Sequence, residues 1–262
     1  MMALVRLLTW NLDGLGRLHV DVRTEAAVFL AITGRTLGEL GRGRRPVWSP
    51  PDVLLLQEVT HHTFQAHLRP HLGRAGYVLH PAHAPETDHF DVVAVRAPAR
   101  IVATEDVPLR GSRYGRELRV VDLADAVGGA PVRVITAHFD SGAPQSAVRV
   151  DGIRQVDELV AEAGGRAVFG GDANLRDVEW DDVADEVSLT DAWSAVGEPP
   201  AARDTWRMGD RSARFDRVWL GPALRATSMR AVGVAKLSPT IGPPSDHIGL
   251  LVDIADARAP AG

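Results

Sequence analysis

The amino-acid sequence predicts a single α/β domain in which strands and helices alternate along the chain. Short apolar or alternating runs of strand length recur from the beginning of the chain to its end. Between some of them lie stretches with the periodicity of amphipathic helices. The chain has 262 residues and 45% apolar content, which is ample for a core. Because no internal repeat, low-complexity tract or interdomain linker is evident, we expect one domain over residues 1–262.

The predicted strands are runs of strand length that are bounded by Gly, Pro or Asp. In chain order they are Val5–Leu8, Val53–Leu56, Val92–Val95, Leu118–Val121, Val132–Ile135, Ala167–Phe169, Phe215–Trp219 and Leu250–Val252. Helical periodicity predicts helices over Val22–Leu40, Thr60–Leu72 and Ser146–Ala163. In the last of these, the apolar residues from Val148 to Val160 lie on one stripe. Residues 38–51 and 239–244 are predicted to be surface loops.

Composition limits the kinds of site and location that the sequence supports. The chain has no cysteine, which excludes disulfides and thiolate metal sites, so that oxygen or histidine must hold any metal. Arg6 interrupts a short apolar start, so we expect no signal peptide, no membrane span and a cytoplasmic location. The net charge of −5 does not by itself indicate nucleic-acid binding. All basic residues except Lys236 are arginine, which makes arginine weaker evidence than usual for phosphate binding.

Polar side chains gather where the predicted strands end. The clusters are Asn11 with Asp13, Gln57 with Glu58, His138 with Ser141, Asp172 with Asn174, Asp216, and Asp246 with His247. Because strands that lie side by side bring their ends together, we expect these groups to surround one cavity. The glycines of "GGDANLRD" are expected to let the backbone turn close to the substrate. This layout is typical of a metal-dependent phosphoester site.

The carboxylates suit a hard divalent cation. Mg²⁺ prefers oxygen ligands, keeps several waters, and is usually held by one or two protein carboxylates together with substrate phosphate. Glu58 is the expected ligand, and Asp13 is expected to support the ion directly or through water. Such an ion neutralises a phosphodiester and stabilises the leaving oxygen.

The remaining polar residues suit proton transfer and phosphate binding. His138 and a protonated His247 are expected to donate hydrogen bonds to non-bridging oxygens. A buried imidazolium needs a counter-charge, which Asp216 is expected to supply. Asp172 is expected to align or deprotonate the attacking water, and the Asn174 amide to fix the water or the phosphate.

Six sequence strings together resemble the endonuclease/exonuclease/phosphatase superfamily. They are "TWNLDGL", "LQEV", "TAHFDS", "GGDANLRD", "RFDRV" and "SDHIGLL", in this order across residues 9–251. The strings "NLDGL", "GDANLRD" and "PSDHIGLL" look most like the tyrosyl-DNA phosphodiesterase 2 branch. The resemblance implies a four-layer α/β sandwich of two packed mixed β-sheets flanked by helices, dependence on Mg²⁺ or Mn²⁺, and phosphodiester hydrolysis. In that branch the substrate is a 5′-phosphotyrosyl bond between a topoisomerase remnant and DNA.

The resemblance also implies roles for individual residues. By motif, the catalytic positions are Asn11, His138, Asp172, Asn174, Asp216 and His247, and the metal-ligand positions are Glu58, Asp13 and Asp246. Ser141 stands at a phosphate-contacting position, and Arg176 matches an arginine near the substrate strand. The chain departs from the branch at Gly16, at Phe139–Asp140 and at Ile248, which stands where tryptophan is common. None of these departures removes a catalytic group.

Several residues have a structural interpretation that stays open. Asn11 alone suits a turn residue, and Asp216 alone suits a surface ion pair with Arg214 or Arg217. Trp193 and Trp206 suit either stacking of a base or tyrosyl ring at the site or ordinary packing. Arg110, Arg113, Arg116 and Arg119 suit either a nucleic-acid backbone or a solvated face. His61, His62, His67 and His71 are expected to lie on a solvated helix, although His67 and His71 have metal-ligand spacing.

Three functions compete at this level. The leading one is a Mg²⁺-dependent phosphodiesterase that acts on DNA ends, as a monomer with no membrane and no inferable protein partner. The second is a phosphatase or phosphodiesterase of the same superfamily that acts on a small phosphorylated metabolite or a lipid headgroup. The third is a catalytically silent binding module. Substrate choice is expected to depend on the loops 109–117 and 201–212.

Overall fold

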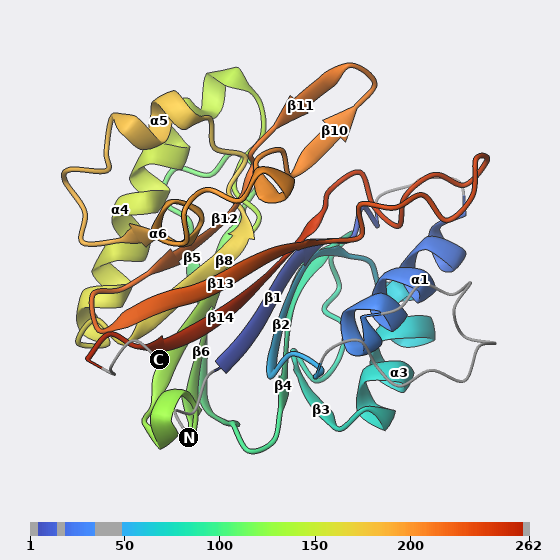
Figure 1. Ribbon diagram of the computed structural model, residues 1–262, viewed down its shortest axis with the longest axis horizontal. Coiled ribbons are helices and arrows are strands. Elements are labelled where there is room, and N and C mark those ends of the chain that lie inside the picture. The colour runs from blue at the N-terminus through green and yellow to red at the C-terminus, as the bar shows by residue number, and fades with distance from the viewer. Residues whose placement is uncertain (1–4, 15–18, 35–48, 259–262) are drawn as a thin grey trace.

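The computed structural model describes residues 5–14, 19–34 and 49–258, which form two mixed β-sheets flanked by helices (Figure 1). The first sheet has the strand order β13 (Leu224–Val232), β14 (Gly249–Asp256), β1 (Val5–Asn11), β2 (Val53–Val59), β4 (Phe90–Arg96) and β3 (Tyr77–His80). The second has the order β5 (Arg100–Pro108), β6 (Glu117–Ala124), β7 (Val132–Thr136), β8 (Ala167–Asp172), β12 (Asp216–Leu220) and β9 (Thr190–Asp191). Strands β1 and β2 run parallel, as do β7 and β8, whereas the other pairs are antiparallel.

The central strands are buried on both faces, which explains their nearly continuous apolar sequences. Leu7 and Leu55 point into the core between the sheets, where they join Val168 of the second sheet. Their neighbours point the other way because successive side chains alternate across a strand, so that Trp10 packs toward α1 (Val20–Thr33). The four-layer sandwich that the resemblance implied is therefore confirmed.

The helices cover the outer faces of the sheets. On the first sheet lie α1, α2 (His61–Thr63), a π-helical segment (Phe64–Leu68) and α3 (Arg69–Arg74). On the second lie α4 (Ser146–Glu162) and the short α5 (Asp177–Asp181), with α6 (Ala192–Ala195) nearby. Single 3₁₀ turns occur at Val127–Gly129, Ala143–Gln145 and Pro200–Ala202. None of the helices in the described part of the chain has the length and apolarity that a membrane crossing needs.

The predicted helices are largely confirmed, with two corrections. Helix α1 ends at Thr33, because Gly34 adopts a left-handed conformation and its N–H caps the Leu30 carbonyl, whereas the predicted helix extended to Leu40. The second predicted helix contains the π-helical segment in its middle. Residues 35–48 lie outside the described residues, and with them most of the predicted loop 38–51. Residues 239–244 form a loop, as expected.

Gly170 and Gly171 lie within β8 and do not form a turn beside the substrate, which corrects the expectation from the sequence. A Cβ atom at Gly170 would lie 2.7 Å from Leu55 of the facing sheet. At Gly171 it would lie 2.2 Å from the carbonyl oxygen of Ala137, on the neighbouring segment. Both glycines are therefore required by close packing, which brings the end of β8 near the ends of β1 and β2.

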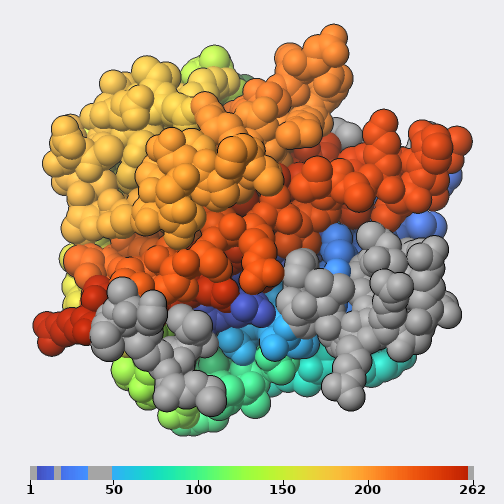
Figure 2. All heavy atoms as spheres, viewed as in Figure 1, coloured from blue at the N-terminus to red at the C-terminus, as the bar shows by residue number. Residues whose placement is uncertain are grey.

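A small hairpin extends from this scaffold. It consists of β10 (Trp206–Met208) and β11 (Arg211–Ala213), which form a two-stranded antiparallel sheet of their own. The hairpin projects from the surface at the top of the space-filling view, beside the segment that leads into β14 (Figure 2). An isolated bridge between Trp206 and His247 joins its base to that segment.

Candidate active site

The polar strand ends meet in one open cleft of about 1090 Å³. Ten of the twelve predicted site residues line it: Asp13, Glu58, His138, Ser141, Asp172, Asn174, Arg176, Trp206, Asp246 and His247. The other two, Asn11 and Asp216, are buried directly behind the lining and contact it. The structure therefore brings the predicted constellation together from strands of both sheets.

Asn11 is the centre of this arrangement. Its side-chain amide donates hydrogen bonds to Glu58 Oε1 at 3.1 Å and to Asp172 Oδ2 at 3.0 Å, while its Oδ1 accepts one from the backbone N–H of Asp13. One neutral side chain thus holds two carboxylates from different sheets at a fixed separation. Asn11 therefore does serve as a turn residue at the end of β1, and its amide in addition joins the two carboxylates.

The donor set at Glu58 fits a hard divalent cation. Among the described residues, ligand atoms of Glu58, His138 and Asp172 all lie within 4.8 Å of one another. Burial, and to a lesser extent the charge of Asp172, raise the pKa of Glu58 to about 7, although the Asn11 amide stabilises the carboxylate. The protein therefore holds a carboxylate without enough positive charge beside it. A carboxylate oxygen whose negative charge is not balanced by a neighbouring positive charge is a suitable ligand for Mg²⁺ or Mn²⁺.

A buried imidazole faces the carboxylates across the cleft. His247 Nδ1 lies 2.7 Å from Asp216 Oδ2, and His247 Nε2 lies 3.6 Å from Asp172 Oδ2. Burial alone would lower the pKa of His247, but the charges of Asp216 and Asp172 outweigh it and raise the pKa to about 10. His247 is therefore an imidazolium at neutral pH, held by Asp216 as the sequence suggested. The alternative surface pairing of Asp216 is wrong, because Arg214 and Arg217 pair with Asp191 and Asp177.

His138 has the opposite protonation state. Burial lowers its pKa to about 4, even though Asp172 lies 3.4 Å from its Nε2 atom. A neutral imidazole carries one N–H, so that His138 is able to donate one hydrogen bond and accept another. Asn174 lies beside Asp172: its backbone N–H donates to Asp172 Oδ1 at 2.9 Å, and its side-chain amide donates to the Phe139 carbonyl.

Three residues of the cleft have left-handed backbones that non-glycine residues seldom adopt. They are Asp13 with φ of 51°, Glu58 with 55° and Asn174 with 48°. Such conformations cost free energy and cluster at functional sites. Gly14 permits the close approach of the first loop, since a Cβ atom there would lie 2.1 Å from the Glu58 carbonyl oxygen.

The other two predicted metal ligands are each engaged with a neighbour. Asp13 Oδ2 lies 3.1 Å from a guanidinium nitrogen of Arg23, which α1 brings to the cleft. Asp246 Oδ2 accepts a hydrogen bond of 3.0 Å from the Trp206 indole. Both carboxylates line the cleft, but neither joins the close group of donor atoms around Glu58 in the described structure. Arg23 was missed in the sequence because helical periodicity does not show which strand end a helix faces.

A sequence profile described as the Endonuclease/Exonuclease/phosphatase family matches residues 8–247, which is most of the chain. The chain belongs to the endonuclease/exonuclease/phosphatase family. The match covers Asn11, Glu58, Asp172 and His247, so that the groups that meet in the cleft all lie within the family domain.

Known relatives in this family carry the name that the sequence strings suggested. The chain is 27% identical to "Tyrosyl-DNA phosphodiesterase 2" of Gallus gallus over an alignment of 264 positions, which covers 94% of this chain and 65% of that protein. It is 25% identical to "5'-tyrosyl-DNA phosphodiesterase" of Caenorhabditis elegans, over 93% of this chain and 65% of that protein. The chain thus spans slightly less than two-thirds of the length of these relatives.

Solved structures of the family share the fold. A crystal structure of "D. rerio TDP2 complexed with single strand DNA product" has a TM-score of 0.77 at 24% identity, covering 96% of this chain and 98% of that one. The human Nocturnin catalytic domain, with bound sulfate anion, has a TM-score of 0.67 at 19% identity, covering 97% of this chain and 94% of that one. These likenesses establish the four-layer architecture for this family member.

The rim of the cleft differs in character from its floor. Ser141 and Arg176 are exposed, and Trp206 is half-buried at the base of the β10–β11 hairpin. Arg211 of the same hairpin lies over the Trp206 ring, with its guanidinium carbon 5.7 Å from the ring centroid. Sequence reasoning missed Arg211. The predicted specificity loop 201–212 contained it, but only the hairpin pairing aims it at the cleft.

The four arginines between Arg110 and Arg119 do not form one basic face. Arg110 pairs with Glu158 at 3.0 Å, and Arg119 is buried against Asp106 at 2.8 Å. Of the four, Arg116 lines the cleft. The other tryptophan in question, Trp193, packs under Arg214 and donates its indole N–H to the Pro199 carbonyl, so that its role is structural.

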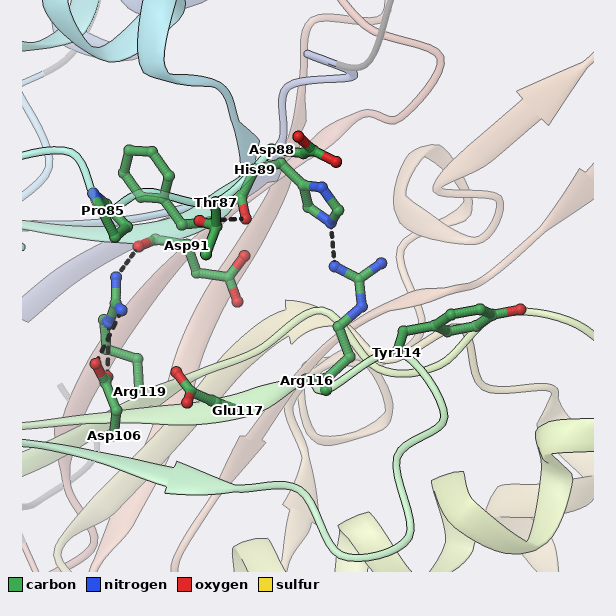
Figure 3. Close-up of a pocket in the computed structure, with 12 residues that line it drawn as sticks. Pro85, Thr87, Asp88, His89, Asp91, Asp106, Tyr114, Arg116, Glu117 and Arg119 are labelled. Atoms are coloured by element: carbon green, nitrogen blue, oxygen red, sulfur yellow. Dashed lines mark hydrogen bonds and ion pairs between the residues drawn. The ribbon is translucent and has the colours of Figure 1, made fainter.

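A second pocket of about 390 Å³ adjoins the cleft and shares Arg116 with it (Figure 3). Arg116 donates a hydrogen bond to His89 Nε2, and Arg119 bridges Asp106 and the Asp91 carbonyl. The backbone of the loop that carries Arg116 is anchored by buried Asp140, which accepts hydrogen bonds from Ser112 Oγ and the Arg113 N–H. Asp140, at which the sequence departs from the branch pattern, therefore has a structural role.

Proposed function

We propose that this chain is a divalent-metal-dependent phosphodiesterase that acts on DNA ends and hydrolyses 5′-tyrosyl phosphodiester bonds. The observation that carries the proposal is the Asn11 side chain, which holds Glu58 and Asp172 together opposite the Asp216–His247 pair. The names of the relatives support the substrate class. A cytoplasmic location and a monomeric state stay predictions from the sequence.

The cation in this proposal is Mg²⁺ or Mn²⁺, and Glu58 is its principal ligand. Asp13 and Asp246 lie in the same cleft and are proposed to orient its water ligands. When bound, such an ion neutralises phosphate charge and stabilises a leaving oxygen. The bound cation also balances the negative charge of the buried Glu58 carboxylate.

Different side chains of the cleft are proposed to activate the attacking water and to bind the phosphate oxygens. Asp172, fixed by Asn11 and by the Asn174 backbone, is proposed to orient the attacking water and accept its proton. The His247 imidazolium donates a charged hydrogen bond to a non-bridging phosphate oxygen, and Asp216 keeps that proton on the ring. His138 donates its single N–H to another phosphate oxygen, and the Asn174 side chain remains tied to the Phe139 carbonyl.

The exposed rim is proposed to hold the nucleic acid. Arg176 and Arg211 offer guanidinium groups for backbone phosphates, and Ser141 offers a hydroxyl. Trp206 presents an aromatic ring on which a base is able to stack. Because these groups lie on loops and on the hairpin, they set the substrate, while the strand ends set the chemistry.

The test is turnover of an oligonucleotide that carries a 5′-phosphotyrosine, measured with Mg²⁺ and with chelator. We expect the parent to release tyrosine only with the divalent ion. We expect Asp172→Asn to lose at least about two orders of magnitude in kcat, since the amide cannot accept the proton of water. The exposed Asp181→Asn is the matched control and is expected to retain parental turnover.

Parental turnover by the folded Asp172→Asn variant would refute the assigned mechanism. A panel of abasic duplex, single-stranded DNA, inositol phosphates and sphingomyelin tests the substrate separately. Hydrolysis of the small phosphoesters without hydrolysis of any oligonucleotide would replace the DNA proposal by the metabolite or lipid alternative. A chain that hydrolyses nothing in the panel would instead be a silent binding module.

A further inference from the structure

Three side chains outside the cleft converge on one point of the surface. His62 Nε2 lies 2.7 Å from Asp21 Oδ1, and His67 Nε2 lies 2.9 Å from the same oxygen atom. The two imidazole rings meet edge to face with centroids 5.9 Å apart. One carboxylate oxygen of α1 is thus approached by two imidazole nitrogens, one from α2 and one from the π-helical segment.

The π-helical segment explains this convergence. On a regular α-helix, residues five apart point in clearly different directions, so His62 and His67 would not share a face. His62 lies in α2, and His67 lies in the π-helical segment Phe64–Leu68 that follows it, whose wider turn changes the direction in which His67 points. Among the described residues, His71, the partner of His67 in the sequence pattern, is not part of the cluster. The expected solvated helix holds for His61 and His62, which are exposed, whereas His67 and His71 are half-buried.

The geometry is close to that of a bound transition metal. With bonds of about 2.0–2.1 Å, tetrahedral zinc holds its ligand atoms about 3.3 Å apart. The two nitrogen-to-oxygen distances here need to widen by only about half an ångström to reach that value. Such adjustment is easy because the side chains of His62 and Asp21 are 61% and 58% exposed. The remaining coordination position is open to water.

We propose that Asp21, His62 and His67 form a binding site for a borderline transition-metal ion such as Zn²⁺, Ni²⁺ or Co²⁺. Two imidazoles and one carboxylate favour these ions over Mg²⁺, which prefers oxygen. The ion links α1 to the π-helical segment. Both elements lead directly from the cleft, since α1 carries Arg23 to Asp13 and the π-helical segment follows β2 and Glu58. The site is distinct from the cleft and does not depend on the proposed phosphodiesterase activity.

The test is a titration of the chelator-stripped chain with Co²⁺ while excess Mg²⁺ is present. Visible absorption of Co²⁺ reports nitrogen ligands, and Zn²⁺ is added to displace it. We expect the parent to bind one equivalent at this site and its Tm to rise with Zn²⁺, because an ion that binds only the folded chain stabilises it. His62→Ala and His67→Ala are expected to weaken binding at least about tenfold. His61→Ala and His71→Ala are matched controls that are expected to bind as the parent does.

Glu58→Gln separates this site from the cleft. We expect it to retain the Co²⁺ spectrum and the rise in Tm with Zn²⁺. The proposal is overturned if the parent binds neither ion at millimolar concentration, or if His61→Ala weakens binding as much as His67→Ala. It is also overturned if only Glu58→Gln removes the spectrum. Circular dichroism of each variant verifies that its fold is intact.

Discussion

Replacing Glu58 by glutamine is expected to make the metal-free protein more stable while it removes the proposed activity. The side chain is 15% exposed, and its pKa is raised from 4.5 to about 7. The folded chain therefore favours protonated Glu58. The associated stability is fully present below about pH 4.5 and is lost as the pH rises through about 7. Glutamine keeps the oxygen that accepts from Asn11 but carries no charge.

The magnitude follows from the two pKa values. Their difference of about 2.5 pH units corresponds to about 3.5 kcal/mol, at about 1.4 kcal/mol for each unit. Because local relaxation and water reduce this cost, we expect Glu58→Gln to raise the free energy of unfolding by about 1–3 kcal/mol near pH 8 in chelator. Near pH 5 the gain falls to about a quarter of that value, since Glu58 is then mostly protonated in the folded chain.

The assay is urea unfolding followed by circular dichroism, in chelator and in Mg²⁺. In Mg²⁺ the advantage of the variant shrinks or disappears: the parent gains about 2.7 kcal/mol at a hundredfold excess over Kd, whereas the variant gains much less. The exposed Glu105→Gln is the control and is expected to change stability by less than about 0.5 kcal/mol under every condition. The reasoning fails if Glu58→Gln is no more stable than the parent near pH 8 in chelator, or if its gain is the same near pH 5.

Two further substitutions test the Asp216–His247 pair of the cleft and the buried ion pair between Arg149 and Glu179. Asp216→Asn is expected to lower the pKa of His247 well below about 10 and to reduce kcat about 10²–10³-fold near pH 8, as measured by NMR titration and steady-state kinetics. Unchanged turnover there would contradict an imidazolium role. Arg149→Met leaves Glu179 buried without its partner and is expected to cost about 3–5 kcal/mol in urea unfolding. Arg154→Met removes an exposed ion pair of the same helix and is expected to cost less than about 1 kcal/mol. Equal losses for these two variants would count against the burial argument.

The fold was predictable where both faces of an element are buried. Each predicted strand overlaps a strand of the structure, because a central strand needs apolar residues whatever surrounds it. The long strands β5 and β13 were not predicted. Both are edge strands, and most residues of β5 are exposed, so that sequences such as "RIVATEDVP" show no strong pattern. Pairing with β6 determines the conformation of β5, whereas β13 buries Leu224, Ala226 and Met229 but has a β-bulge between Ala226 and Ser228 that breaks the alternation.

The sequence by itself determined which chemical groups this protein brings to its strand ends. Residue type and position within a strand are local properties, so that Glu58, Asp172 and His247 were recognisable as polar groups at strand ends, and six motifs in one order together indicated the family. Only the tertiary structure decided how those groups behave. Asn11 lies between two carboxylates, His138 is neutral while His247 is charged, and Arg23 reaches Asp13, because the packing of two sheets and a helix sets distance and burial. Charge interactions depend on the distance between groups and on the exclusion of water, and neither can be read directly from the sequence.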